Sequence, residues 1–253
     1  MGYFHNKTFL LTGAYGGFGA YFTRYLLERG AKLVLTDYKL PAQKTTNDPN
    51  ILLEMEADLS LESGADSIFQ RTQAEKITVD GIIHNAGIAS IGKFPDTPKK
   101  DGDKILQVNL LAPIHLNRLF LPGMVERKSG HLVHISSVAG FMSPAGLSYY
   151  SISKFGISTM GHCLYSEYKD QGIFVTNCYP FFTKTNILES SRFGGISTQL
   201  PDFLVEDPAK VVLELVDGIQ DRQTEVYPGI TSKSLNILKR MFPSISQFFS
   251  KLT

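Results

Sequence analysis

Short apolar runs alternate with longer segments of helical spacing along the 253-residue chain. Runs of strand length are found at residues 7–11, 32–36, 51–56, 81–84, 131–135 and 173–178, with a last short strand at 226–227. Residues 17–29 and 149–170 instead repeat apolar positions every three or four residues, which predicts amphipathic helices. Strands that alternate with helices form βαβ units with right-handed crossovers. We therefore expect an α/β protein with a doubly wound parallel sheet and helices on both faces.

The chain contains no repeat, low-complexity segment or linker that would divide it. We predict a single domain over residues 1–231, in which the Ser- and Gly-rich residues 186–207 form a loop region that covers the substrate. Residues 232–253 form an amphipathic extension with basic flanks. Its apolar positions are Leu235, Leu238, Phe242, Ile245, Phe249 and Leu252, and Pro243 interrupts it. Such a segment can pack on its own domain, on a second subunit or on a membrane surface.

Composition and charge narrow the functional class. The net charge is +1 and 43% of residues are hydrophobic, as in a globular protein without general affinity for nucleic acid. The two cysteines, Cys163 and Cys178, form no disulfide framework, and no His/Cys cluster indicates a metal site. The N-terminus lacks the pattern of a secretory signal, and no apolar run approaches the roughly 20 residues of a membrane span. We expect a cytoplasmic protein.

A glycine-rich turn follows the first predicted strand and opens the first predicted helix. Residues 12–19 read TGAYGGFG. Glycine lets a ligand approach the main chain, and a helix N-terminus attracts phosphate. The candidate cofactor residues here are Gly13, Tyr15, Gly16, Gly17, Phe18 and Gly19. An ordinary tight turn is the alternative, which the strand–turn–helix context disfavours. The turn therefore predicts a Rossmann-type dinucleotide site.

Asp37 ends the second predicted strand. A carboxylate at this point can accept hydrogen bonds from the ribose hydroxyls of NAD and repels a 2′-phosphate. Tyr15 in the turn is not a basic residue that would attract that phosphate, although Lys39 lies close by. NAD is therefore favoured over NADP, unless Asp37 is only an exposed turn carboxylate.

Tyr150 and Lys154 are candidates for acid/base chemistry. Residues four apart share one helix face, and an ammonium beside a phenol favours the phenolate and lowers its pKa. Tyr149 lacks such a partner, because Ser153 occupies its i+4 position. In isolation the pair is typical of an ordinary surface. Ser137 follows the strand at 131–135 and could donate a hydrogen bond to a substrate oxygen.

Five motifs together resemble the short-chain dehydrogenase/reductase family over about residues 7–185. These are the TGxxxGxG turn, Asn85-Ala86-Gly87, Asn109, Ser137 and the pair Tyr150…Lys154. The resemblance implies catalysis by Asn109, Ser137, Tyr150 and Lys154, with Tyr150 as the general acid/base. It also implies that Asn109 holds a water that relays protons from Lys154, and that Lys154 binds the nicotinamide ribose. On its own, Asn109 is only a polar residue inside a helix.

The same resemblance implies further cofactor contacts. These are Asp58, Leu59, Asn85, Ala86, Gly87, Pro180, Thr183 and Thr185, in addition to Tyr150 and Lys154. One position departs from the family, in which Pro-Gly stands where this chain has Pro180-Phe181. Phenylalanine lacks the backbone freedom of glycine, which puts the nicotinamide-end contacts and the substrate mouth in doubt.

The expected substrate wall is apolar. Its candidate positions are Ser137, Ala139, Phe141, Met142, Pro144, Leu147, Tyr150, Phe181 and Phe182. Apolar walls suit a steroid, retinoid, fatty-chain or aromatic alcohol, although these residues could simply pack under the loop. We expect an NAD-dependent alcohol dehydrogenase or ketone reductase that forms a homodimer or homotetramer. The alternatives are a non-catalytic NAD-binding regulator or scaffold, and an isomerase or dehydratase of the same fold.

Overall fold

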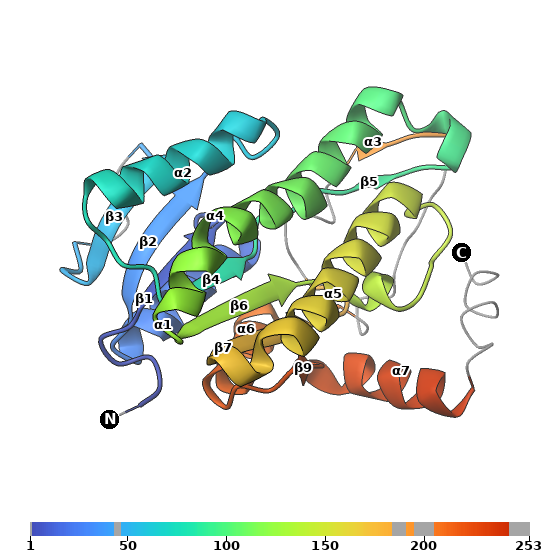
Figure 1. Cartoon of the computed structure of the whole chain (residues 1–253). Helices are drawn as coiled ribbons and strands as arrows, with labels where there is room; N and C mark the ends of the chain where they lie inside the picture. Colours follow the sequence, from blue (N-terminus) through green and yellow to red (C-terminus); the bar gives the residue numbers. More distant parts are fainter. Residues whose placement is uncertain (1, 43–46, 184–190, 195–204, 243–253) are drawn as a thin grey trace.

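The computed structural model describes residues 2–42, 47–183, 191–194 and 205–242. Its centre is a parallel sheet of seven strands in the order β3-β2-β1-β4-β6-β7-β9 (Figure 1). The strands are β1 (Thr8–Thr12), β2 (Lys32–Asp37), β3 (Ile51–Glu56), β4 (Gly81–His84), β6 (Gly130–Ile135), β7 (Ile173–Cys178) and β9 (Glu225–Val226). The order reverses direction between β1 and β4, as expected of a doubly wound sheet.

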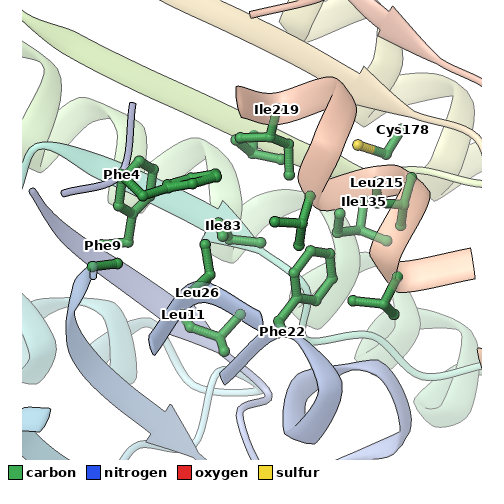
Figure 2. Packing of buried hydrophobic residues seen from close by; sticks show 14 of the residues in the cluster. Phe4, Phe9, Leu11, Phe22, Leu26, Ile83, Ile135, Cys178, Leu215 and Ile219 are labelled. Atoms are coloured by element: carbon green, nitrogen blue, oxygen red, sulfur yellow. The ribbon is translucent and has the colours of Figure 1, made fainter. Parts of the chain in front are cut away.

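Helices cover both faces of the sheet. Figure 1 shows α2 (Glu62–Ala74), α4 (Ala112–Glu126) and α5 (Ser148–Tyr168) on one side, with α1 (Gly17–Glu28) and α6 (Pro208–Gln220) on the other. Every residue of β1, β4 and β6 is buried, because central parallel strands are covered on both faces. The α1/α6 side packs Phe22 and Leu26 against Leu215 and Ile219 over the sheet (Figure 2).

A π-helical turn lies between α3 (Lys99–Leu106) and α4, at Gln107–Leu111. Two short strands, β5 (Ser90–Ile91) and β8 (Ser191–Arg192), pair in parallel apart from the main sheet. Among the described residues, short 3-10 turns lie at Phe94–Asp96, Val138–Gly140 and Lys169–Gln171.

Helix α7 (Gly229–Met241) forms the described part of the predicted C-terminal extension. Its Ser232 is buried and Leu235 packs on the domain, whereas Ile237 and Met241 are exposed. The rest of the predicted extension, residues 243–253, lies outside the described residues. Within the part of the chain that is described, no helix is both long and apolar enough to cross a membrane.

The parallel sheet and its two helical layers confirm the predicted fold class. The strands at residues 51–56, 81–84 and 173–178 have the predicted bounds, and the predicted helix at 149–170 runs from Ser148 to Tyr168. The last strand covers Glu225–Val226 rather than residues 226–227. Most of the predicted covering loop, residues 186–207, lies outside the described residues.

Candidate active site

The predicted site residues gather at the carboxyl ends of neighbouring strands. Asp37 ends β2, Asn85 follows β4, Ser137 follows β6 and Pro180 follows β7. Parallel strands present their carboxyl ends at one edge of a sheet, and ligands of doubly wound proteins bind at that edge, where the strand order reverses. The site therefore lies where the fold itself predicts one.

The glycine turn after β1 is tightly packed. Gly13 has a φ of +65°, and a Cβ there would lie 2.8 Å from the Ala86 Cα. A Cβ on Gly19 would lie 2.0 Å from the Gly13 carbonyl oxygen. The Asn85 amide donates to the carbonyl oxygens of Thr12 at 3.0 Å and Gly13 at 2.9 Å. Glycine is thus required at positions 13 and 19, and Asn85 fixes the turn from β4.

The N-terminus of α1 is suited to a phosphate group. The helix begins after Gly16 with no side-chain cap and no acidic residue in its first turn. Its first N–H groups and its positive dipole end can therefore receive an anion. A Cβ built on Gly16 would meet only the Gly13 carbonyl oxygen, at 3.7 Å, so the turn leaves room above it. These features fit the pyrophosphate of a dinucleotide.

Asp37 is held by the main chain. Its carboxylate accepts hydrogen bonds from the backbone N–H of Tyr15 at 2.8 Å and of Tyr38 at 2.7 Å. The Tyr15 phenol donates to the Glu54 carboxylate on β3. Two backbone donors therefore fix a negative charge beside the glycine turn. Asp58, after β3, accepts from the Ser60 N–H at 2.9 Å.

Lys154 is almost fully buried, at 3% exposure. Its Nζ donates to the Ile135 carbonyl oxygen at 2.7 Å, and burial lowers the pKa of Lys154 to about 8. A Cβ built on Gly87 would lie 3.5 Å from the Lys154 Nζ and from the Asn109 Oδ1. The ammonium and this amide therefore converge on the segment after β4.

Asn109 lies in the π-helical turn and is 1% exposed. Its Oδ1 accepts from the Ile88 N–H at 2.9 Å, and its Nδ2 donates to the Ile88 carbonyl at 2.8 Å and to the Ser153 Oγ at 3.1 Å. The side chain thus ties the helix to the loop after β4. Because the Asn109 Oδ1 and the Lys154 Nζ each lie 3.5 Å from the position of a Cβ on Gly87, the two polar groups are near each other.

Tyr150 lies near the start of α5 and is 9% exposed. Burial raises the pKa of Tyr150 to about 12, and a hydrogen bond with Ser137 opposes this rise. The Lys154 Nζ lies 5.5 Å from the centre of the Tyr150 ring. We expected the Lys154 ammonium to lower this pKa, but burial dominates and the group that opposes it is the Ser137 hydroxyl. Tyr149 instead stacks on Phe94, with ring centres 5.2 Å apart.

Ser137 connects the ends of β6 and β7. Its Oγ accepts from the Ala139 N–H at 3.1 Å and donates to the Pro180 carbonyl at 3.4 Å. The same hydroxyl interacts with Tyr150. Ser137, Tyr150 and Lys154 therefore come together as the sequence predicts.

The predicted substrate wall divides into two clusters. Ala139 and Leu147 pack with Tyr150 and the partly buried Phe182. Met142, Phe141 and Phe181 belong to a separate cluster with Tyr179, Tyr227 and Leu235. Tyr150 belongs to the first cluster and not to the second. The first cluster also includes Ala89 and Ile91, which the sequence did not single out, although they follow the Asn85-Ala86-Gly87 motif directly.

The nicotinamide-end segment is only partly described. The Pro180 carbonyl accepts from the Val138 N–H at 3.0 Å, and the Thr183 hydroxyl donates to the Phe181 carbonyl at 2.9 Å. Phe181 packs edge-on against Phe182, with ring centres 5.1 Å apart. Thr185 lies outside the described residues.

Comparisons with known proteins agree with this geometry. The family model described as short chain dehydrogenase matches residues 7–194. Epidermal retinol dehydrogenase 2 of Mus musculus is 33% identical over 248 residues, which cover 92% of this chain and 77% of that protein.

Solved structures share the fold at low sequence identity. A short chain dehydrogenase from Burkholderia cenocepacia in complex with NADP superposes with a TM-score of 0.82 at 17% identity, covering 99% of each chain. One from Burkholderia phymatum in complex with NAD has a TM-score of 0.81 at 22% identity, covering 98% of this chain and 96% of that chain. From the matched family model and the motifs assembled at the sheet edge, we conclude that this chain belongs to the short-chain dehydrogenase/reductase family.

Proposed function

We propose that the protein is an NAD(H)-dependent oxidoreductase that transfers a hydride between nicotinamide and the hydroxyl or carbonyl carbon of an apolar substrate. The observation that carries the proposal is the meeting of Tyr150, Ser137 and Lys154 beside a glycine turn suited to a dinucleotide. The family supplies the reaction class, and these residues supply its proton chemistry.

The side chains have distinct tasks in this proposal. When bound, the nicotinamide cofactor accepts the hydride from an alcohol or gives it to a ketone. Tyr150 accepts the alcohol proton during oxidation and returns it during reduction. Ser137 donates a hydrogen bond to the substrate oxygen, and the Lys154 ammonium stabilises the Tyr150 phenolate. Because burial raises the pKa of Tyr150 to about 12, the phenol needs this positive charge to act as a base near neutral pH.

Asp37 supports NAD as the preferred cofactor. Its carboxylate is fixed by the Tyr15 and Tyr38 N–H groups, so it cannot turn away from a nucleotide without losing both bonds. A fixed negative charge repels the 2′-phosphate of NADP and can accept the 2′-hydroxyl of NAD.

The apolar surroundings of Tyr150 support an apolar alcohol or ketone. Ala139, Leu147 and Ile91 pack around the phenol together with Phe182. The mouse relative is named a retinol dehydrogenase, and retinol is an apolar alcohol of the class that such a wall accommodates. We propose a retinoid, steroid or other apolar alcohol as the substrate class.

A panel of apolar secondary and primary alcohols, read by NADH absorbance with NADP⁺ in parallel, tests the function. Tyr150→Phe should lower turnover at least a thousandfold while NADH binding stays within about twofold of the original protein. Tyr149→Phe is the matched control and should retain turnover. Turnover retained in Tyr150→Phe would overturn the role of this phenol. NADH binding with no turnover of any alcohol or ketone would favour the regulator or isomerase alternatives.

We also propose that the protein is cytoplasmic and forms a homodimer or homotetramer. We further propose that residues 232–253 contact a lipid surface. Sedimentation velocity of the purified protein measures the number of subunits. Cosedimentation with vesicles, compared between the full chain and a chain that ends at Ser232, measures the lipid contact.

A further inference from the structure

A row of buried polar side chains lies between the sheet and the helices α4 and α5. We call it the polar seam, and it consists of His84, Asn117, His134, Asn177, Ser158 and Ser136. Each of these residues is at most 4% exposed. Buried polar groups are costly unless they are hydrogen-bonded, so a row of this kind is fixed in geometry when every member finds a partner.

The hydrogen bonds of the seam run in one direction. The Asn117 Oδ1 can only accept, so His84 donates from its Nε2 at 2.8 Å. The Asn117 Nδ2 donates to the His134 Nε2 at 3.2 Å, so His134 carries its proton on Nδ1 and donates to the Asn177 Oδ1 at 3.1 Å. If the Asn117 amide were turned round, its Nδ2 would donate to the His84 Nε2, and His84 would carry its proton on Nδ1. That buried N–H would have no partner among the described residues.

Both imidazoles are neutral in this arrangement. Burial lowers the pKa of His84 to about 4 and of His134 to about 3. The two rings stack, with centres 5.3 Å apart. The neutral His84 ring therefore donates to Asn117 at the start of the seam. The neutral His134 ring accepts from Asn117 and donates to Asn177.

The far end of the seam reaches the backbone of Lys154. Asn177 donates from Nδ2 to the Ser158 carbonyl at 3.0 Å. The Ser158 Oγ lies 2.8 Å from both the Ser136 Oγ and the Lys154 carbonyl oxygen. Ser136 donates to that same carbonyl at 2.9 Å. The Lys154 carbonyl oxygen therefore accepts hydrogen bonds from the Ser158 hydroxyl of its own helix and from the Ser136 hydroxyl at the end of β6.

The two ends of the seam lie at the two halves of the site. His84 directly precedes Asn85, whose amide fixes the glycine turn. Ser136 directly precedes Ser137 and follows Ile135, whose carbonyl accepts from the Lys154 Nζ. The Gly140 backbone packs closely on the Ser136 hydroxyl, since a Cβ on Gly140 would lie 2.2 Å from the Ser136 Oγ.

We propose that Ser136 is a positioning residue that ties the backbone of Lys154 to β6 and thereby sets the place of the ammonium beside Tyr150. The inference rests on the proposed function. Ser158 belongs to α5 like Lys154, so its hydrogen bond to the Lys154 carbonyl stays within one helix. Its other contact reaches the sheet side only through the Ser136 hydroxyl. Ser136 directly follows β6, and its hydroxyl donates across to the Lys154 carbonyl.

The comparison of Ser136→Ala with Ser158→Ala tests the proposal. In each variant the other serine still donates to the Lys154 carbonyl, so both lose one buried hydroxyl and keep that carbonyl satisfied. Ser136→Ala alone loses the hydrogen bond from the end of β6 to the Lys154 carbonyl. We expect it to lower kcat about ten- to a hundredfold with KM and the NADH Kd within about twofold, because a small displacement of a catalytic group costs rate rather than binding. Ser158→Ala should stay within about twofold in all three quantities.

A second measurement does not depend on turnover. NMR titration of lysines labelled at the ε carbon gives the pKa of Lys154, assigned with Lys154→Arg. Release of Lys154 from its buried place should raise its pKa toward the ordinary value in Ser136→Ala and leave it unchanged in Ser158→Ala. If Ser136→Ala does not fold, Ser136→Cys, which keeps a weak donor, takes its place and should give a smaller change in the same direction.

Equal changes in the two serine variants, or no change in Ser136→Ala, would overturn the positioning role. If the original protein oxidises no alcohol, the proposed function fails. The NMR titration then still decides whether Ser136 positions Lys154.

Discussion

The Asp37 carboxylate derives its importance from how it is held rather than from its charge alone. Backbone N–H groups of Tyr15 and Tyr38 donate to its two oxygens, at 2.8 and 2.7 Å. Tyr15 belongs to the glycine turn, so the carboxylate and the phosphate-binding turn form one rigid unit. In the function we propose, this fixed negative charge repels the 2′-phosphate of NADP.

Asp37→Asn should therefore weaken the preference for NAD. The amide keeps the size and one acceptor oxygen but removes the negative charge. We expect the ratio of kcat/KM for NAD to that for NADP to fall about tenfold or more, which corresponds to about 1.4 kcal/mol. Asp58→Asn is the control and should change both cofactors alike. An unchanged ratio in Asp37→Asn would contradict the role of this charge.

Single residues were predictable from the sequence where a local rule identified them. The i+4 spacing separates Tyr150 from Tyr149, and the structure places Tyr149 away from Lys154, against Phe94. Met142 and Phe181 could not be placed, because their contacts come from Tyr179, Tyr227 and helix α7, which are distant in the sequence. The burial of Tyr150 was missed for the same reason, since distant residues produce it.

The glycine turn and α1 act together as an element. Gly19 allows the first turn of α1 to lie directly on the backbone of Gly13 and Ala14, where a Cβ would come within 2.0 Å. Gly16 stands three residues earlier, and its Cβ would find its nearest atom at 3.7 Å. Close packing of the turn therefore requires glycine at position 19 but not at position 16.

Gly19→Ala should lower the melting temperature of the cofactor-free protein by several degrees, because the backbone must move to admit the methyl group. Gly16→Ala should change it little. Differential scanning calorimetry of both variants measures this. A similar loss in both would show that the close approach at Gly19 is not what the turn depends on. The same samples should show weaker NADH binding for Gly19→Ala.

The π-helical turn at Gln107–Leu111 is an element that the sequence does not predict. The sequence indicates a helix around Asn109 but carries no signal for an extra residue in one turn, since the motif QVNLL has ordinary helical composition. The wider turn brings the Asn109 amide to both backbone groups of Ile88. Such turns are frequent at functional sites, and tertiary contacts rather than local propensity select them.

At the scale of the whole molecule, the sheet carries three buried histidines. His84 lies on β4, and His131 and His134 lie on β6. The structure buries each of these three histidines, at 2% exposure or less. Burial keeps these rings neutral, and their hydrogen-bond partners come from other elements, such as Tyr3 and Thr176 for His131, so they could not be predicted from local patterns.

These histidines should make the protein sensitive to mild acid. Burial lowers the pKa of His84 to about 4 and of His131 and His134 to about 3, whereas an unfolded histidine titrates near 6.5. Below about pH 6.5 the unfolded chain therefore binds protons that the folded protein does not. The stabilisation is fully present above that pH and is lost as the pH falls toward 4.

Urea unfolding at pH 7.5, 6.0 and 5.0 measures this loss. Each histidine contributes up to about 1.4 kcal/mol per pH unit well below pH 6.5, so the three together approach roughly 4 kcal/mol per pH unit. His131→Gln should reduce the slope of unfolding free energy against pH by about a third, even if it lowers stability at every pH. His162→Gln changes an exposed histidine and is the matched control for the loss of one imidazole. A slope that is equal in His131→Gln and the original protein would show that His131 does not contribute to the acid sensitivity.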